Sequence, residues 1–192
     1  MSPLEAKLPD QLSLVAAVAA IQNSLPKCGK VRVVTIDGPA GSGKTTLAAN
    51  LASKFEQASV IHLDELYEGW DKSLDQVLFE RIQAWILTPL ENGLPPKHLR
   101  YDWGKSAFTS WSEVAYSPVV ILEGVGSGHT SLRHQVSQAI WIEADETLLL
   151  ERVVKRDGEA VRAEMLIWQE RERAYFDFHE VKNSANLHLR GQ

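Results

Sequence analysis

Short apolar segments alternate along the chain with longer segments in which apolar residues recur every three or four positions. The short segments are rich in β-branched residues, which indicates buried strands. The longer segments are typical of helices that turn one face toward a core. Strands are expected over residues 31–36, 59–63, 118–122, 139–142 and 185–189. Helices are expected around residues 14–21, 47–55, 74–85, 145–157 and 161–175.

The order of these segments predicts an α/β protein. Strands that alternate with helices form a parallel sheet with helices on both faces, so we expect a three-layer α/β/α fold with a five-stranded, mainly parallel sheet. Residues 1–28 are expected to form an N-terminal helix packed on one domain of residues 29–192. The helix over 74–85 is expected to end at Pro89. Residues 89–117 lack a clean period and are long for a plain loop, so we expect them to be functional.

Composition narrows the possible partners. The chain has 192 residues, which suits one domain with a sizeable core. Its net charge of -5 gives no general attraction to nucleic acid. The apolar stretch over 12–21 is too short to span a bilayer and lacks a basic leader. We therefore expect a cytoplasmic protein with no membrane or nucleic-acid partner, and its oligomeric state stays open.

Residues 38–45 match the phosphate-binding pattern G-x-x-x-x-G-K-S/T in full, between a predicted strand and a predicted helix. Glycines let backbone amides converge on phosphate oxygens, and the helix N-terminus favours negative charge. Lys44 is expected to reach the β- and γ-phosphates, and the Thr45 hydroxyl to hold Mg²⁺. The sequence thus predicts a P-loop NTPase fold that binds ATP and Mg²⁺. The predicted nucleotide-binding residues are Gly38, Pro39, Ala40, Gly41, Ser42, Gly43, Lys44, Thr45 and Thr46.

Two carboxylates follow predicted strands on the same side as this loop. Asp64 comes after the second strand and Glu123 after the third. In an open parallel sheet the ligand site lies beyond the carboxyl ends of the strands. Phosphoryl transfer to a hydroxyl needs a base for the acceptor and oxygen ligands for the metal. We predict Asp64 as the base and Glu123 as a metal ligand; solvated strand-end acids are the alternative.

Aromatic residues gather in the irregular middle of the chain: Tyr67, Trp70, Tyr101, Trp103 and Trp111. Their faces could hold a planar base or a sugar ring. They could equally form a small core under the long segment, and both interpretations stay open.

Basic residues cluster around a predicted helix break at Asp157-Gly158. In a kinase, a lid at this position would bring guanidinium groups to the transferred phosphoryl group. We predict this role for Arg152 and Arg156. A solvated helix face with ion pairs four residues apart is the alternative.

Five motifs together resemble successive landmarks of the uridine kinase and phosphoribulokinase group, and more narrowly short actinobacterial uridine kinase-like proteins. The motifs are Asp37–Thr45, Leu63–Tyr67, Arg100–Trp103, Ile121–Gly124 and Arg152–Asp157. Their order and spacing fit over about residues 31–190. The chain departs from the group at Trp103, where the group has phenylalanine, and its middle is shorter.

The resemblance implies roles for individual residues. Asp64 matches the group's base, and Tyr67 lies near its acceptor. Tyr101 and Asp102, with Trp103 beside them, match the motif that contacts the nucleoside. Glu123 matches the metal-side glutamate, and Arg152 and Arg156 match the lid. The implied acceptor-binding segment covers about residues 65–117, with Trp70 in it, and the implied lid covers about residues 152–163.

We therefore expect an ATP-dependent phosphotransferase that moves the γ-phosphoryl group to a hydroxyl of a small metabolite, most simply a nucleoside similar to uridine or cytidine. A nucleoside monophosphate kinase is one alternative. A P-loop ATPase or nucleotide switch that acts through a protein partner is another. The sequence does not identify the acceptor.

Overall fold

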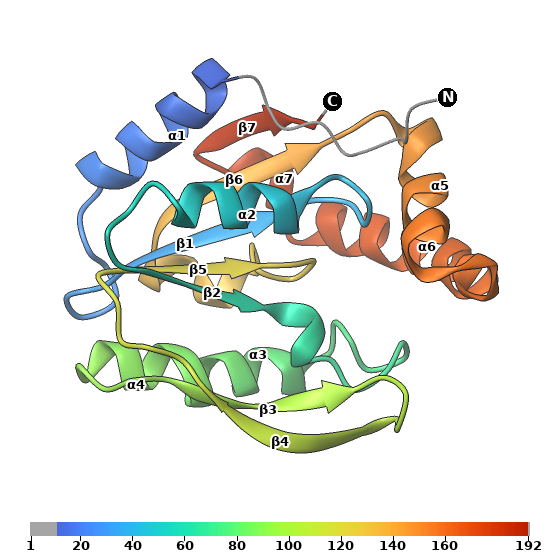
Figure 1. The fold of residues 1–192 in the computed structure, drawn as a ribbon, viewed down its shortest axis with the longest axis horizontal. Coiled ribbons are helices and arrows are strands. Elements are labelled where there is room, and N and C mark those ends of the chain that lie inside the picture. Colours follow the sequence, from blue (N-terminus) through green and yellow to red (C-terminus); the bar gives the residue numbers. More distant parts are fainter. Residues whose placement is uncertain (1–10, 192) are drawn as a thin grey trace.

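Five parallel strands form the central sheet of the computed structural model, which describes residues 11–191 (Figure 1). Their order is β2-β5-β1-β6-β7, so the first strand lies at the centre. The strands are β1 (Arg32–Asp37), β2 (Ala58–His62), β5 (Val119–Glu123), β6 (Val136–Glu143) and β7 (Leu187–Arg190). All five predicted strands are confirmed within a few residues. The fully buried β5 shows why they were recognisable, since strands covered on both faces are continuous apolar runs.

Helices cover both faces of this sheet (Figure 1). One face carries α1 (Gln11–Asn23) and α2 (Lys44–Ala52). The other face carries α3, α4, α6 and α7, and α5 packs against α6. Their bounds are α3 (Gln76–Ile82), α4 (Thr88–Glu91), α5 (Glu146–Asp157), α6 (Arg162–Phe178) and α7 (Val181–Ser184). The predicted three-layer α/β/α fold with a five-stranded parallel sheet is therefore confirmed.

Alternation along β1 divides the core into two layers. Val34 and Ile36 pack with α1 and α2, whereas Val33 packs with the helices of the opposite face. Ala17 and Ile21 of α1 are fully buried in the first layer. Residues 1–10 of the segment expected to form the N-terminal helix lie outside the described residues.

The predicted helix end at Pro89 is wrong. After α3 the chain continues through a π-helical turn, η2 (Gln83–Leu87), directly into α4. Pro89 lies in the first turn of α4, where a missing N–H costs little because first-turn amides have no partner within their own helix. The wider π turn thus lets the helical path continue past a proline.

The segment without a clean period contains an antiparallel hairpin, β3 (Lys97–Asp102) and β4 (Ala107–Glu113). Figure 1 shows it beside α3 and α4, away from the five-stranded sheet. Phe108 and Trp111 pack edge-on against Trp85 of η2, and the Arg81 guanidinium lies 4.6 Å from the centre of the Phe108 ring. Over residues 11–191, no helix is long and apolar enough to cross a membrane.

Candidate active site

The loop between β1 and α2 curves around the start of α2. At Gly38, an added Cβ would come within 2.0 Å of the Ile142 carbonyl oxygen. Gly41 has a φ of +83°, and its added Cβ would come within 2.5 Å of the Leu149 carbonyl oxygen. Such contacts are impossible for a residue with a side chain, and the left-handed φ of Gly41 favours glycine. The loop conformation therefore depends on the glycines of the phosphate-binding pattern.

Lys44 reaches back across this loop from the first turn of α2. Its Nζ donates to the carbonyl oxygens of Gly38 at 2.7 Å and Pro39 at 2.9 Å. The side chain is largely buried but lines the main cavity. A fixed cation with these anchors is suited to phosphate oxygens, because ammonium groups bind phosphate as point charges.

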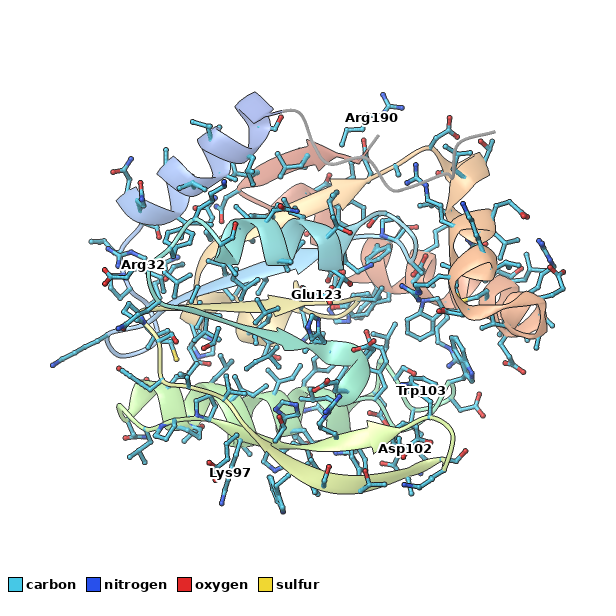
Figure 2. The ribbon with its side chains drawn as sticks, in the orientation of Figure 1. Arg32, Lys97, Asp102, Trp103, Glu123 and Arg190 are labelled. Carbon is cyan, nitrogen blue, oxygen red and sulfur yellow. The ribbon has the colours of Figure 1, made fainter. Side chains whose placement is uncertain are left out.

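Glu123, labelled in Figure 2, lies at the end of β5 and contacts side chains from two neighbouring elements. The Thr45 hydroxyl donates to Glu123 Oε1 at 3.0 Å, and His62 Nδ1 lies 2.5 Å from the same oxygen. The register of the sheet explains the second contact, since His62 of β2 pairs with Glu123 of β5. Hydrogen bonding to Glu123 raises the pKa of His62.

The hydroxyl and carboxylate oxygens of Thr45 and Glu123 are ligands of the type that Mg²⁺ prefers. Among the described residues there is no group of three or more His, Cys, Asp or Glu side chains that could hold a metal. Mg²⁺ in kinase sites is held by one or two protein ligands together with substrate phosphates, so the two groups fit such a site.

Asp64 lies in a short 3₁₀ turn, η1 (Leu63–Glu65), directly after β2. Burial raises the pKa of its carboxyl group, and the nearby charge of Glu123 raises it further. His62 and Arg156 act in the opposite direction. A carboxyl group with a raised pKa is a better proton acceptor than one with the ordinary aspartate pKa.

One cavity of about 1120 Å³ brings the predicted groups together. The phosphate loop, Asp64 and Glu123 line it, as do residues of the hairpin and of α5 and α6. Five aromatic rings also line it: Tyr67, Trp70, Tyr101, Trp103 and Trp168. Each ring contacts the next in the spatial order Tyr67, Trp168, Trp70, Trp103, Tyr101, with centroid distances between 5.2 and 5.9 Å. They form a continuous wall, which we call the aromatic wall.

The aromatic wall is tied to the turn that carries Asp64. The indole Nε1 of Trp103 donates to the Asp64 carbonyl oxygen at 3.1 Å. Tyr67 is buried and donates through its hydroxyl to the Val125 carbonyl oxygen at 2.6 Å. Trp168 joins the wall from α6.

Arg152 and Arg156 both line the cavity from α5. Arg152 Nη1 donates to the Gly41 carbonyl oxygen of the phosphate loop at 3.4 Å. Arg156 makes two bonds of 2.7 Å to the Asp157 carboxylate, and these raise its pKa. The nearby Arg162 instead pairs with Glu151 and Glu159.

Some predicted residues do not reach the cavity. Asp102 accepts hydrogen bonds from the backbone and side chain of Lys105, at the hairpin end that Figure 2 labels, and it does not line the cavity. Gly38, Pro39 and Ser42 also lie outside the lining. Gly38 and Pro39 act on the site through their bonds to Lys44.

Asp37, to which the sequence patterns assigned no role, is buried at the end of β1. Its carboxylate accepts hydrogen bonds from the backbone amides of Gly38, Gly126 and Gly128. Burial raises the pKa of this group to about 6. Asp37 therefore joins the phosphate loop to the glycine-rich loop after β5. Its position directly before Gly38, the first glycine of the pattern, was the sequence signal that could have indicated this role.

Glu65 and the hairpin form a second unpredicted contact. Glu65 forms an ion pair of 2.8 Å with the Arg100 guanidinium, and its other carboxylate oxygen lies 2.9 Å from His98 Nε2. Both partners belong to β3. The turn that carries Asp64 is therefore held to the hairpin by the contacts of Glu65 as well as by the hydrogen bond from Trp103.

Comparison with known proteins places these features in a family context. A family model described as AAA domain matches residues 34–177. Uridine-cytidine kinase C of Dictyostelium discoideum is 28% identical over 167 residues, which are 82% of this chain and 37% of that protein. The chain thus spans little more than a third of the length of this curated relative. The match confirms the resemblance that the motifs indicated.

Solved structures share the fold. The structure of a possible uridine kinase from Bacillus stearothermophilus has a TM-score of 0.67 at 17% identity, and the match covers 93% of this chain and 97% of that one. A putative fructose transport system kinase from Silicibacter sp. TM1040 has a TM-score of 0.57 at 20% identity, with coverage of 92% and 98%. At these identities the likeness supports the fold alone.

Proposed function

The chain belongs to the AAA domain family, and we propose that it moves the γ-phosphoryl group of ATP to a hydroxyl of a small metabolite. The observation that carries this proposal is the lining of one cavity. The phosphate loop, the carboxylates of Asp64 and Glu123, and the aromatic wall all face it. A nucleotide switch that acts through a partner protein has no need of an aromatic wall and a carboxylate that line the same cavity as the phosphate loop.

The nucleotide-binding half of the proposal rests on the phosphate loop. Residues 38–46 would hold ATP, with Lys44 at the outer phosphates and Thr45 and Glu123 at Mg²⁺. When bound, ATP would supply the phosphoryl group, and Mg²⁺ would neutralise charge on the phosphates. The glycines at positions 38, 41 and 43 support this role, because backbone amides converge on phosphate oxygens most readily where no Cβ obstructs them.

On the acceptor side, Asp64 would accept the proton of the attacking hydroxyl. Its raised pKa supports this assignment, and its place beside Glu123 puts the base near the metal ligands. Arg152 and Arg156 would bring positive charge to the transferred group from the lid, residues 152–163. Tyr67, Trp70, Tyr101 and Trp103 would pack against the body of the acceptor.

We infer that the acceptor has a planar ring and is most simply a nucleoside. The aromatic wall supports a ring that stacks. Within residues 65–115 the two arginines are already paired with carboxylates, Arg81 with Glu68 and Arg100 with Glu65. Recognition of a monophosphate uses unpaired guanidinium groups, so this pairing favours a neutral acceptor over a nucleoside monophosphate.

A screen for the acceptor tests the proposed function. Melting temperatures would be measured with nucleosides, vitamins, sugars and monophosphates, each in the presence of Mg²⁺ and a non-hydrolysable ATP analogue. The hits would then be assayed for ADP release with ATP. We expect ADP release to require one class of acceptor with a planar ring. ADP release at the same rate without any acceptor would favour an ATPase or switch and contradict the proposal.

Glu123→Gln should raise the Mg²⁺ concentration needed for half-maximal activity. The amide keeps the size of the carboxylate and a hydrogen bond from Thr45, but it loses the charge that attracts the metal. We expect a shift of about ten-fold, the effect of about 1.4 kcal/mol. Metal titrations of ADP release measure it, with the exposed Glu113→Gln as control. A metal titration that matches that of the wild type would show that Glu123 is not a metal ligand.

Trp103→Phe should lower kcat with little change in acceptor KM. Phenylalanine keeps an aromatic ring but removes the indole N–H that bonds to the Asp64 carbonyl oxygen. A hydrogen bond contributes about 0.5–1.5 kcal/mol, so we expect about a 2–10-fold loss. Trp103→Ala also removes the ring and should raise the acceptor KM. Equal kinetic constants in Trp103→Phe and wild type would show that this bond does not position Asp64.

A further inference from the structure

A buried carboxylate that the proposed chemistry does not use lies against the phosphate loop. Glu172 of α6 is 3% exposed, and its carboxylate accepts a hydrogen bond from the backbone amide of Ala40, at 3.1 Å from one oxygen and 3.3 Å from the other. Ala40 is the third residue of the loop and lines the cavity. The contact joins residues 132 positions apart in the sequence.

Helix α6 places this carboxylate between the phosphate loop and the residues of α6 that line the cavity. The buried positions of α6 are Met165, Trp168, Glu172, Tyr175 and Phe176, which share one helical face. Met165 and Trp168 line the cavity, and the Tyr175 hydroxyl donates to the Gly126 carbonyl oxygen at 3.4 Å. Glu172 is thus the acidic residue on an otherwise apolar and aromatic face, where burial of a charge is costly unless it has a partner.

The charges around Glu172 come from several elements. Burial raises the pKa of its carboxyl group to about 7. The positive charge of Lys44 on α2, the Ala40 amide and the Trp168 side chain lower it, and the negative charge of Asp37 on β1 raises it. Tyr175, one turn further along α6, stays neutral because burial raises the pKa of its phenol far above its ordinary value.

We propose that Glu172 is a positioning residue of the nucleotide site, which holds the Ala40 amide so that the loop keeps the curvature needed for phosphate binding, and which takes up a proton when the nucleotide binds. The inference rests on the proposed function, because it concerns the same phosphate loop. It adds a residue from the helix after the lid to the machinery that holds the nucleotide.

Both the hydrogen bond to Ala40 and the uptake of a proton are consistent with the chemistry of a carboxyl group. A carboxyl group can accept the Ala40 hydrogen bond in either protonation state, through its carbonyl oxygen when protonated. The phosphates bring several negative charges close to Glu172, and a neighbouring negative charge favours the protonated form. Nucleotide affinity should therefore be highest below the pKa of free Glu172 and should fall as the pH rises through that pKa.

The test measures binding alone. Dissociation constants for the magnesium complex of a non-hydrolysable ATP analogue would be determined between pH 6 and 8.5 for the wild type, Glu172→Gln, Glu172→Ala and Glu170→Gln. Glu170 is an exposed glutamate of the same helix, so its variant loses the same charge without touching the loop. The titration of the analogue itself is common to all four proteins and cancels in the comparison.

In the wild type and Glu170→Gln we expect affinity to fall with rising pH by up to about ten-fold more than in Glu172→Gln, the effect of a pKa change of about one unit. Glutamine keeps an acceptor for the Ala40 amide, so its affinity near pH 6 should match the wild type. Glu172→Ala leaves the amide without this acceptor and should bind about ten-fold more weakly than Glu172→Gln at every pH. Melting curves would establish that each variant is folded.

A Glu172→Gln profile as steep as that of the wild type would overturn the proton uptake. Wild-type affinity near pH 6 in a folded Glu172→Ala would overturn the positioning role. If Glu172→Ala does not fold, the Glu172→Gln profile decides the outcome. A wild type that fails to bind the analogue would contradict the proposed function itself, which is a distinct result from equal binding by all four proteins.

Discussion

Lys44→Ala is expected to reduce turnover by at least about 10²–10³-fold, the usual effect of removing one preorganised group that stabilises charge in a transition state. Lys44 is the cation fixed over the phosphate loop by its bonds to Gly38 and Pro39. Alanine removes this charge from both the bound nucleotide and the transition state, so the dissociation constant for ATP should also rise. Steady-state kinetics and nucleotide titrations measure the two effects.

Lys54→Ala is the matched control, because Lys54 is exposed just beyond the end of α2. It loses the same charge without touching the loop and should behave like the wild type. Circular dichroism and melting curves would show whether Lys44→Ala is folded. Normal ATP-dependent activity in a folded Lys44→Ala protein would contradict the assignment of residues 38–46 to ATP.

Asp64→Asn should lower kcat by about 10²–10⁴-fold, the range that a general base contributes. Asparagine has the same shape but cannot take the proton of the acceptor hydroxyl. Because the base acts in the chemical step, binding of ATP and acceptor should change little. Single-turnover rates at saturating ATP and acceptor measure the loss, and the exposed Asp177→Asn of α6 is the control.

The raised pKa of Asp64 adds two expectations. In the wild type kcat/KM should fall as the pH falls through this pKa, which lies above the ordinary aspartate value of 3.8, and the variant should lack this limb. The charged form of a carboxyl group with a raised pKa is disfavoured in the folded state, so Asp64→Asn should melt no lower than the wild type near neutral pH. A change in acceptor KM with no change in kcat would assign Asp64 to binding and not to chemistry.

The parts of the site that follow from local sequence were predictable. The phosphate loop is a contiguous pattern between a strand and a helix, and Asp64 and Glu123 each follow a recognisable apolar strand. Since the carboxyl ends of parallel strands meet at one edge of the sheet, their common location could be expected as well. The lining of the cavity agrees with this reasoning.

The parts that depend on distant contacts were not predictable. His62 meets Glu123 because β2 pairs with β5 in one particular register, and Glu172 meets Ala40 across 132 positions. The β3–β4 hairpin escaped notice because much of β4 is exposed and shows no apolar alternation to mark a strand. The π turn before Pro89 likewise depends on packing, since Ile86 and Leu87 are fully buried in the core.

Asp102 shows the limit of reading roles from a motif. The resemblance implied a contact with the acceptor, yet its carboxylate pairs with Lys105 at the hairpin end. The neighbouring Tyr101 and Trp103 face the cavity. Side chains of adjacent strand residues point to opposite faces. A motif can therefore contribute one residue to the aromatic wall while the next residue points away from the cavity.

The fate of the γ-phosphoryl group tests the central claim most directly. The protein would be mixed in excess with ATP labelled in the γ-phosphate, Mg²⁺ and the best acceptor from the screen, and the products separated after one turnover. We predict that the label moves to the acceptor, and that inorganic phosphate stays at the level found with Lys44→Ala. Label released as inorganic phosphate at a rate that the acceptor does not change would contradict the claim.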